Sequence, residues 1–220
     1  GVSYRVLIIS TNMQIKTSAL IGLSRHRIGV DGTGVTTLVA FHGCPLNCKY
    51  CLNPQALSPR GVWKKFTPKG LFETVKKDDL YFRATGGGVT FGGGEPLLSC
   101  KEILHFHKHC MDNGKNWKIN IETSLNVPGI FAEVLVGLVD HWIVDIKDMN
   151  PEIYEAYTGK DNKFVIDNLQ HLIANKAKIT VRVPLIPEFN TESNVEKSIE
   201  ALHKMGITDI DRFTYTIKTH

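Results

Sequence analysis

The sequence has no apolar run long enough to cross a bilayer and no segment of low complexity. A membrane-spanning helix needs about 20 consecutive apolar residues. The N-terminal YRVLIIS is too short for a secretory signal and lacks its small-residue cleavage site. Charge of one sign is also scarce, because 26 Lys and Arg residues stand against 22 Asp and Glu residues in a chain of 220. We therefore expect no membrane partner and no nucleic-acid partner.

Cysteine is sparse and unevenly distributed, with three of the five residues inside one stretch of eight positions. A secreted disulfide framework distributes an even number of cysteines through a small chain. This pattern therefore predicts a cytoplasmic protein.

Strand-like and helix-like runs alternate from Thr36 onwards, as is typical of a parallel sheet with crossover helices. Six strands are expected, at 36–42, 88–91, 118–123, 141–147, 178–186 and 212–218. No linker divides them, so we predict one α/β domain over residues 1–220. Residues 1–35 would form a hairpin-like cap and residues 36–220 a partial (β/α)6 barrel of the TIM type. A doubly wound open sheet is the alternative.

The helices carry start and stop signals. Expected starts are a polar residue shortly before a proline and the Ser-x-x-Glu capping box; expected stops are glycines. The start signals lie at Thr67, Ser99, Asn126, Asn150 and Ser193, and the stops at Gly114 and Gly206.

HGCPLNCKYC, residues 42–51, places Cys44, Cys48 and Cys51 directly after the first expected strand. Ligands bind at that end of the sheet in parallel α/β folds. Thiolates at these spacings can converge on one soft metal or one cluster. A structural zinc site needs a fourth ligand, and His42, the nearest candidate, is expected to point sideways. We therefore favour an iron–sulfur cluster with one open iron over zinc or three separate buried cysteines.

TGGGVTFGGGEPLL, residues 85–98, holds two glycine triplets around a short strand. Glycine permits tight turns, and a backbone without side chains lets a ligand approach N–H and C=O groups closely. The stretch lacks the Lys and Ser/Thr of a P-loop and the spacing of a Rossmann fingerprint. Neither nucleotide-binding motif is therefore present.

Period-two alternation places charged residues on one face of the later strands. Glu122, Asp145, Lys147 and Arg182 lie on such faces, and Glu95 follows the preceding strand. If these faces line the barrel, the five side chains converge near its C-terminal mouth. Charges inside a barrel are costly unless paired or ligand-bound, so we expect ion pairs or a ligand there.

Two of these motifs resemble signatures of the radical S-adenosylmethionine (SAM) superfamily. One is the C-x-x-x-C-x-x-C cluster with Tyr50 before its last cysteine, and the other is Gly-Gly-Glu-Pro beginning at Gly93. Together with VDGTG and VDIKDMNPEIY, they make the chain from about Gly29 to Asn190 similar to the glycyl-radical-enzyme activating enzymes of that superfamily.

The resemblance implies a [4Fe-4S] cluster on the three cysteines whose open iron binds SAM. Electron transfer from the reduced cluster would yield methionine and a 5′-deoxyadenosyl radical, which takes hydrogen from a glycine of a partner glycyl-radical enzyme. A flavodoxin or ferredoxin is the implied electron donor. The implied cofactor contacts are Tyr50, Gly93, Gly94, Glu95, Glu122, Asp145, Lys147 and Arg182, and the implied monovalent-cation site is Glu122, Thr123 and Asp145.

The chain departs from the family pattern in several places. Gly92 stands where a serine is usual, Thr33 where a proline is usual, and Glu122 where an aspartate is usual. The longer Glu122 side chain shifts the oxygens of the implied cation site. The chain ends at FTYTIKTH without the Pro-Tyr-His of the family, so it is either truncated or an unusually short member.

Two other functions stay open. One is a small-molecule radical SAM enzyme similar to 7-carboxy-7-deazaguanine synthase; the other is a non-enzymatic zinc-binding or cluster-binding module, which Gly-Gly-Glu-Pro disfavours. Cys100 and Cys110 are too few for another cubane and are expected to pack as small hydrophobes on the second helix. His105 and His109, one helical turn apart, are expected on a solvated face and not at a metal site.

Overall fold

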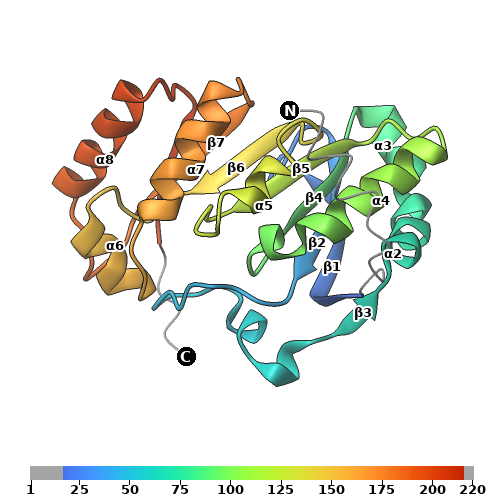
Figure 1. Cartoon of the computed structure of the whole chain (residues 1–220), viewed down its shortest axis with the longest axis horizontal. Coiled ribbons are helices and arrows are strands. Elements are labelled where there is room, and N and C mark those ends of the chain that lie inside the picture. Colours follow the sequence, from blue (N-terminus) through green and yellow to red (C-terminus); the bar gives the residue numbers. More distant parts are fainter. Residues whose placement is uncertain (1–16, 216–220) are drawn as a thin grey trace.

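The computed structural model describes residues 17–215. Its strands form one sheet in the order β3-β1-β2-β4-β5-β6-β7-β8 (Figure 1). The strands are β1 Ser18–Ile28, β2 Val35–Phe41, β3 Lys64–Phe66, β4 Gly88–Gly93, β5 Lys118–Thr123, β6 His141–Asp145, β7 Ile179–Leu185 and β8 Ile210–Thr214. The α-helices are α2 Pro68–Val75, α3 Asp79–Thr85, α4 Cys100–Asp112, α5 Ile130–Glu133, α6 Pro151–Thr158, α7 Lys163–Ala174 and α8 Glu192–Lys204. Short 3-10 turns are η1 Pro54–Ala56, η2 Pro59–Gly61, η3 Lys76–Asp78 and η4 Pro96–Ser99.

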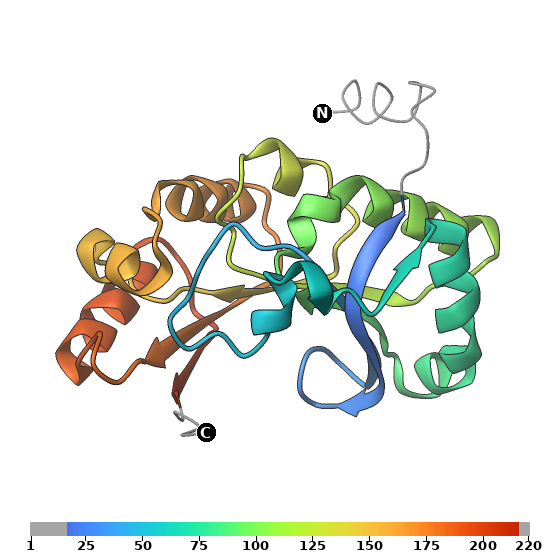
Figure 2. The same cartoon turned by 90° about the horizontal axis from the view of Figure 1, so that it is seen from below.

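The six predicted strands are all present, and neighbours from β2 to β8 pair in parallel. The parallel strands β2 and β4 to β8 lie side by side in chain order, as in a barrel, whereas a doubly wound sheet reverses its strand order. The sheet stays open, with β3 and β8 as its edges, so the predicted partial barrel is confirmed and the doubly wound alternative is wrong. Seen from below, helices α4, α5 and α7 cover one side of the sheet (Figure 2). The predicted strand 212–218 begins earlier, at Ile210, and its residues 216–218 lie outside the described residues.

The N-terminal segment is part of the sheet. β1 pairs antiparallel with β2, so the hairpin is not confined to residues 1–35 as predicted: its second arm is the first strand of the barrel. The three-residue strand β3, which the sequence pattern did not reveal, pairs antiparallel with the start of β1. Residues 1–16 of the predicted cap lie outside the described residues.

The hydrophobic core lies between the sheet and its covering helices. Trp142 and Val144 of β6 are fully buried there, which agrees with the predicted apolar face of that strand. Cys100 and Cys110 of α4 belong to the same core, so their predicted role as small hydrophobes is confirmed. No helix in the described part of the chain is long and apolar enough to span a membrane.

The helix starts were predicted with mixed success. Thr67 and Asn150 cap α2 and α6, since their side chains accept backbone N–H bonds. The prediction for Ser193 is wrong: α8 begins earlier, where Thr191 forms a capping box with a different residue type, Asn194. The Ser99 prediction is right in position, because Ser99 is the N-cap residue of α4, but the predicted capping box is absent. The Asn126 prediction is wrong.

The missing cap bond at Ser99 and the missing helix start at Asn126 both have local reasons. Ser99 makes no cap bond, because the 3-10 turn η4 runs directly into α4. Asn126 uses its amide to bond Tyr154 Oη and the Asp161 carbonyl, and α5 begins only at Ile130. Both predicted stops are confirmed, because Gly114 and Gly206 follow α4 and α8 with positive φ.

Candidate functional site

The cysteine loop, residues 42–53, leaves β2 and crosses the C-terminal ends of the strands (Figure 2). Its far side is docked on α6: Asn47 N–H donates to the Thr158 carbonyl at 2.9 Å and Lys49 N–H to the Tyr157 carbonyl at 3.1 Å. His42 is not turned toward the cysteines, because its Nε2 lies 2.8 Å from the Ser58 carbonyl oxygen. The predicted sideways orientation of His42 is therefore confirmed.

Glycines clamp the start of this loop from β4. Gly94 N–H donates to the Phe41 carbonyl at 2.8 Å, and Glu95 N–H donates to the Gly43 carbonyl at 2.7 Å. A Cβ on Gly94 would lie 2.1 Å from the Gly43 oxygen. A Cβ on Gly93, where φ is +97°, would lie 2.7 Å from the Phe41 nitrogen. The glycines of the Gly-Gly-Glu-Pro motif are therefore required by packing as well as by any ligand, because two backbone segments meet here without room for a side chain.

The three clustered cysteines line one cavity of ≈160 Å³ at the C-terminal end of the sheet. This volume far exceeds that of a single water molecule. The other lining residues are Leu38, Leu46, Leu52, Asn53, Gly93, Gly94, Glu122, Thr123, Ser124, Asp145, Lys147 and Tyr215. Nine residues predicted for the site therefore meet at one cavity.

The donor set of this cavity fits a cluster. Burial raises the pKa of Cys44 to about 12 and also raises the pKa of Cys48, although Lys147 opposes the shift on Cys48. Such thiols become ligands only when a bound metal displaces their protons. No three His, Cys, Asp or Glu side chains among residues 17–215 come close enough to hold a single ion. A cubane places each thiolate on a different iron, so it needs no such close convergence.

A cation and an anion stand beside the cysteines. Lys147 is buried, and its Nζ lies 3.3 Å from Asp145 Oδ2 and 3.1 Å from Tyr215 Oη. Burial alone would lower the pKa of Lys147, but Asp145 and Tyr215 outweigh it and hold this pKa well above its usual value. The cavity thus keeps a protonated ammonium whose hydrogen-bond donors can serve an anionic ligand group.

Glu122 and Arg182 form the second ion pair of the barrel interior, with Arg182 Nη1 donating to Glu122 Oε1 at 2.6 Å. Burial and Asp145 raise the pKa of Glu122, and Arg182 opposes them. Arg182 also donates from Nη2 to the Val30 carbonyl at 3.0 Å. The predicted convergence of charges is confirmed, and the charged side chains form the expected ion pairs with one another. Arg182 itself is not among the residues that line the cavity.

Glu95 lies behind the cavity wall and is only 1% exposed. Its Oε1 accepts from Thr123 Oγ1 at 2.7 Å and from Leu97 N–H at 3.2 Å. Its Oε2 accepts from Ser124 Oγ at 2.7 Å and Ser124 N–H at 3.0 Å. Burial raises the pKa of Glu95 while these donors oppose the shift. The side chain thus ties the Gly-Gly-Glu-Pro turn to the end of β5.

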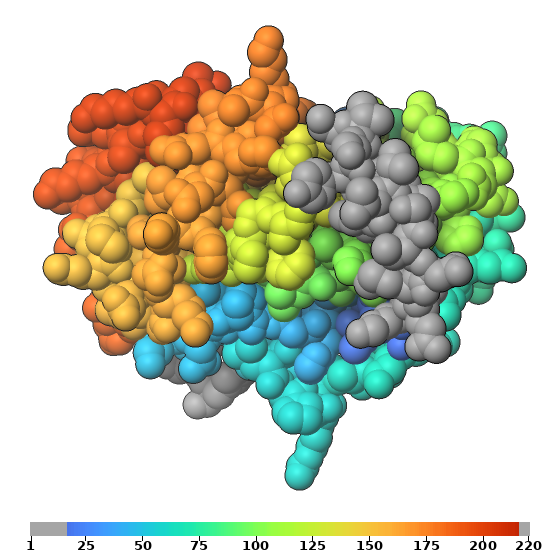
Figure 3. Space-filling view, in the orientation of Figure 1, coloured from blue at the N-terminus to red at the C-terminus, as the bar shows by residue number. Residues whose placement is uncertain are grey.

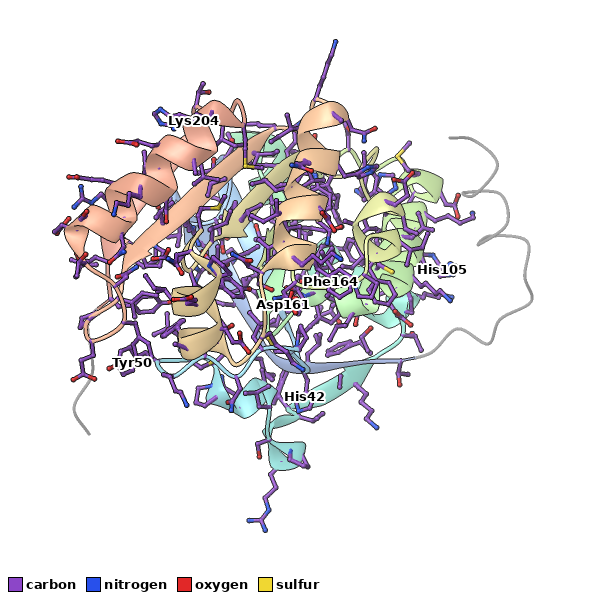
Figure 4. The ribbon with its side chains drawn as sticks, turned by 60° about the vertical axis from the view of Figure 1, so that its left-hand side comes forward. His42, Tyr50, His105, Asp161, Phe164 and Lys204 are labelled. Carbon is purple, nitrogen blue, oxygen red and sulfur yellow. The ribbon has the colours of Figure 1, made fainter. Side chains whose placement is uncertain are left out.

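Tyr50, the aromatic residue of the cysteine motif, points outward. Figure 4 shows it at the edge of the molecule, and its hydroxyl donates to Glu188 Oε2 at 2.7 Å. Its ring makes edge contacts with Tyr157 and Phe189 at centroid distances of 6.1 and 5.7 Å. Tyr50 therefore anchors the cysteine loop and does not line the cavity.

Comparison with known proteins places this site in a family. Residues 38–202 match the radical SAM superfamily. The (2S)-3-sulfopropanediol dehydratase activating enzyme of Klebsiella oxytoca is 34% identical over 80% of this chain and 74% of its own length. The pyruvate formate-lyase-activating enzyme of Clostridium pasteurianum is 32% identical over 76% of this chain and 69% of its own length.

The chain belongs to the radical SAM superfamily, among the glycyl-radical-enzyme activating enzymes. Two solved structures share its fold at low identity. Streptococcus suis SuiB has a TM-score of 0.61 at 14% identity over 81% of this chain and 39% of SuiB. Native anSMEcpe with bound AdoMet has a TM-score of 0.58 at 19% identity over 78% of this chain and 48% of its own. The chain thus spans less than half of either solved structure.

For a radical SAM enzyme, the most informative residue that the sequence reasoning missed is Tyr215. It follows β8, lines the cavity and stacks with Lys147 Nζ 5.5 Å from its ring centroid. Its place at the C-terminal end of the last strand was the available signal. Asn53, which follows Cys51 closely in sequence, also lines the cavity without having been singled out. Ser124 lines it too, on the polar face predicted for β5.

Two of the departures from the family pattern, Gly92 and Glu122, explain each other because the two residues are neighbours. A Cβ on Gly92 would lie 3.3 Å from Leu38 Cδ1 and 3.4 Å from the Glu122 side chain. The larger Glu122 therefore occupies room beside the position where the family usually has serine. His105 and His109 both lie on α4, and Figure 4 shows His105 on the other side of the molecule from Tyr50 of the cysteine loop. His109 packs against the Phe72 ring at 6.2 Å.

Proposed function

We propose that this chain binds a [4Fe-4S] cluster through Cys44, Cys48 and Cys51, cleaves SAM reductively, and abstracts hydrogen from a glycine of a partner glycyl-radical enzyme. The cluster would supply the electron for cleavage, and the resulting 5′-deoxyadenosyl radical would take the hydrogen atom. The single observation that carries the proposal is that all three cysteines line the cavity that also holds Lys147 and Asp145. Relatives named as activating enzymes support the glycyl-radical partner.

The residues around the cavity have different proposed roles. Lys147 would bind the carboxylate of SAM, because it is a buried, protonated donor beside the cysteines. Gly93 and Gly94 would offer backbone groups to its amino end. Glu95 would act by holding these glycines, since all its hydrogen bonds in the structure run to the protein. Tyr50 would bind the cofactor only after turning from Glu188.

A monovalent cation would fit among Glu122, Thr123 and Asp145, because all three residues line the cavity and carry oxygen atoms. Hard cations prefer oxygen ligands of this kind. Arg182 competes for Glu122, so occupation of the site would require that pair to loosen. Replacing potassium by the larger tetramethylammonium ion in SAM-binding assays tests this role, and equal SAM affinity in both salts would contradict it.

The experiment for the main proposal begins with anaerobic reconstitution and an assay for iron and sulfide. Dithionite and SAM are then added, and 5′-deoxyadenosine is measured by chromatography. An intact cluster without SAM cleavage would rule the proposal out. A glycyl-radical enzyme encoded beside this gene is then mixed with the chain, and electron paramagnetic resonance should show the glycyl doublet. SAM cleavage without a doublet for any such partner would remove the activating step alone.

The electron for this chemistry must come from outside the chain. We propose a flavodoxin or ferredoxin as donor and the cytoplasm as location, because the reduced cluster requires a reducing compartment. Replacement of dithionite by a reduced flavodoxin in the same assay should sustain 5′-deoxyadenosine formation. Failure with both classes of donor would contradict this part of the proposal.

A further inference from the structure

Charge is distributed unevenly along this nearly neutral chain. Residues 32–72, which include the cysteine loop, contain five Lys or Arg residues and no Asp or Glu. The rest of the chain holds 21 Lys and Arg residues and 22 Asp and Glu residues. All the excess positive charge therefore lies in the segment that surrounds the predicted cluster ligands.

The cations of this segment are exposed and available. Arg60, Lys64 and Lys65 are solvent-exposed, as is Lys49 inside the cysteine loop. Among the described residues none of these four forms an ion pair, and the Lys64 ammonium lies over the Phe66 ring, 4.9 Å from its centroid. The cations of the barrel interior, by contrast, are paired with carboxylates.

Large apolar side chains are exposed on the same segment. Leu52 is 72% exposed, Trp63 57% and Leu57 39%. Leu52 directly follows Cys51 and also lines the cysteine cavity, so this surface reaches the edge of the proposed cluster site. Exposed apolar residues surrounded by charges of one sign are typical of a protein-binding surface.

The segment is held rigidly against the cysteine loop. Gly43 N–H donates to the Ala56 carbonyl at 2.9 Å, and the His42 ring bonds the Ser58 carbonyl. Gly61 packs so closely that a Cβ would lie 1.8 Å from the Gln55 oxygen. In Figure 3 the chain from the cysteine loop to β3, blue to cyan, forms the lower face of the molecule. A partner that docks there would sit at a fixed distance from the cysteines.

We infer that this lower face, formed by Lys49, Leu52, Leu57, Arg60, Trp63, Lys64 and Lys65, docks an acidic one-electron donor protein. Charge complementarity selects an acidic partner and accelerates its encounter. A donor needs only to approach the cluster from outside, whereas the glycine that loses hydrogen must enter the cavity itself. The step is one electron passing from a reduced flavin or iron–sulfur protein to the cluster, with no bond formed. The inference rests on the proposed function, of which it specifies the donor surface.

The test compares two charge-reversed variants of the reconstituted protein. Lys64→Glu with Lys65→Glu changes the docking surface. Lys197→Glu with Lys204→Glu, on two exposed lysines of α8, changes the net charge equally elsewhere; Figure 4 shows Lys204 far from Tyr50 and His42. Stopped flow follows bleaching of the cluster by flavodoxin hydroquinone, which becomes the semiquinone. Dithionite is the control reductant.

At low ionic strength the Lys64/Lys65 variant should be reduced by flavodoxin at least about tenfold more slowly than the wild type, and the α8 variant within about twofold. The difference should shrink at about 0.5 M salt, and dithionite should reduce all three proteins equally. Equal slowing of both variants would overturn the inference. Normal reduction of the Lys64/Lys65 variant with loss of glycyl-radical formation would assign the surface to the protein substrate instead.

Carbodiimide cross-linking of the unaltered chain to flavodoxin gives a readout independent of cluster activity and of variant folding. Links mapped to Lys49, Lys64 or Lys65 support the surface, and links confined to other lysines refute it. If reduction and cross-linking follow this pattern but SAM is not cleaved, the docking surface is supported and the proposed function is refuted. The two proposals can therefore fail independently.

Discussion

The charged side chains at the two ends of the barrel have different surroundings. At the N-terminal ends of the parallel strands, Asp78 accepts from Arg25 Nε at 2.8 Å and from Thr37 Oγ1 at 2.7 Å. Asp31 likewise accepts from Arg27 and Thr36 at 2.5 Å. At the C-terminal ends the charged side chains stand beside a cavity, and the cysteines form no disulfides.

This difference separates groups that hold the fold from groups that can bind a ligand. A buried carboxylate with its acceptors filled stabilises the native state, and its loss leaves donors unsatisfied. A charge beside an open cavity keeps hydrogen-bonding capacity for something that enters. In parallel α/β barrels the second kind gathers at the C-terminal ends of strands. Variants at the two ends should therefore change different measurable quantities.

The largest expected effect separates the three loop cysteines from the two on α4. Replacement of Cys44, Cys48 or Cys51 by alanine should abolish cluster binding, because a cubane with two protein ligands is not retained. Cys100→Ala and Cys110→Ala should keep it and lower the free energy of unfolding by about 1–2 kcal/mol through a small core cavity. Iron and sulfide analysis after reconstitution checks both. An essential Cys100 would refute the open-iron site.

The next effect concerns the backbone clamp. Gly94→Ala puts a methyl group 2.1 Å from the Gly43 oxygen, so the cysteine loop must shift and cluster content should fall at least about fivefold, a loss of about 1 kcal/mol in loop positioning. Gly22→Ala is the matched control, since a Cβ there has no atom within 4 Å. Equal cluster content in the two variants would mean that the loop adapts freely.

The third prediction probes the cavity charge. Lys147→Met should weaken SAM binding to the reconstituted protein by at least about tenfold, because a charge-assisted hydrogen bond is lost. Stability should fall by at most about 1 kcal/mol, because the Asp145 side chain that loses its partner is 26% exposed and can be hydrated. Calorimetry measures the affinity and urea unfolding the stability. Unchanged SAM affinity together with lowered stability would mean that Lys147 stabilises the fold, as Asp78 does, and does not bind SAM.

The N-terminal end should show the opposite behaviour. Burial alone would raise the pKa of Asp78, but Arg25 and Thr37 outweigh it and lower that pKa. The pair therefore stabilises the fold above the unfolded pKa of about 4, and the stabilisation is lost as pH falls through the lowered folded pKa. Asp78→Asn should cost about 1–3 kcal/mol at neutral pH, less in acid, with SAM affinity unchanged. Urea unfolding at both pH values checks this, and a pH-independent cost would contradict it.

The sequence predicted the functional end of the barrel better than its supporting contacts. Cysteine spacing and period-two alternation follow from local geometry, so Cys44 and Asp145 could be placed at the cavity without coordinates. Glu95 and Tyr50 could not, because their orientation depends on partners distant in the chain, Ser124 and Glu188. β3 escaped prediction because three residues carry no usable periodicity.

Glu95 lies at the C-terminal end of the barrel, but both of its oxygens accept hydrogen bonds from the protein, as those of Asp31 and Asp78 do at the N-terminal end. A variant of Glu95 therefore tests whether a residue's position or its hydrogen bonding determines its role. Glu95→Gln keeps the shape but turns one acceptor into a donor that faces Thr123 Oγ1 or the Ser124 N–H and hydroxyl. If bonding determines the role, the free energy of unfolding falls by about 1–3 kcal/mol, and SAM affinity changes less than about threefold in the fraction that stays folded. Thr123→Val, which removes one of the donors, should lower stability in the same direction and partly overlap with Glu95→Gln in the double variant. A tenfold loss of SAM affinity in Glu95→Gln with unchanged stability would instead make the Glu95 carboxylate a direct cofactor ligand and show that the bonds to β5 rearrange when SAM binds.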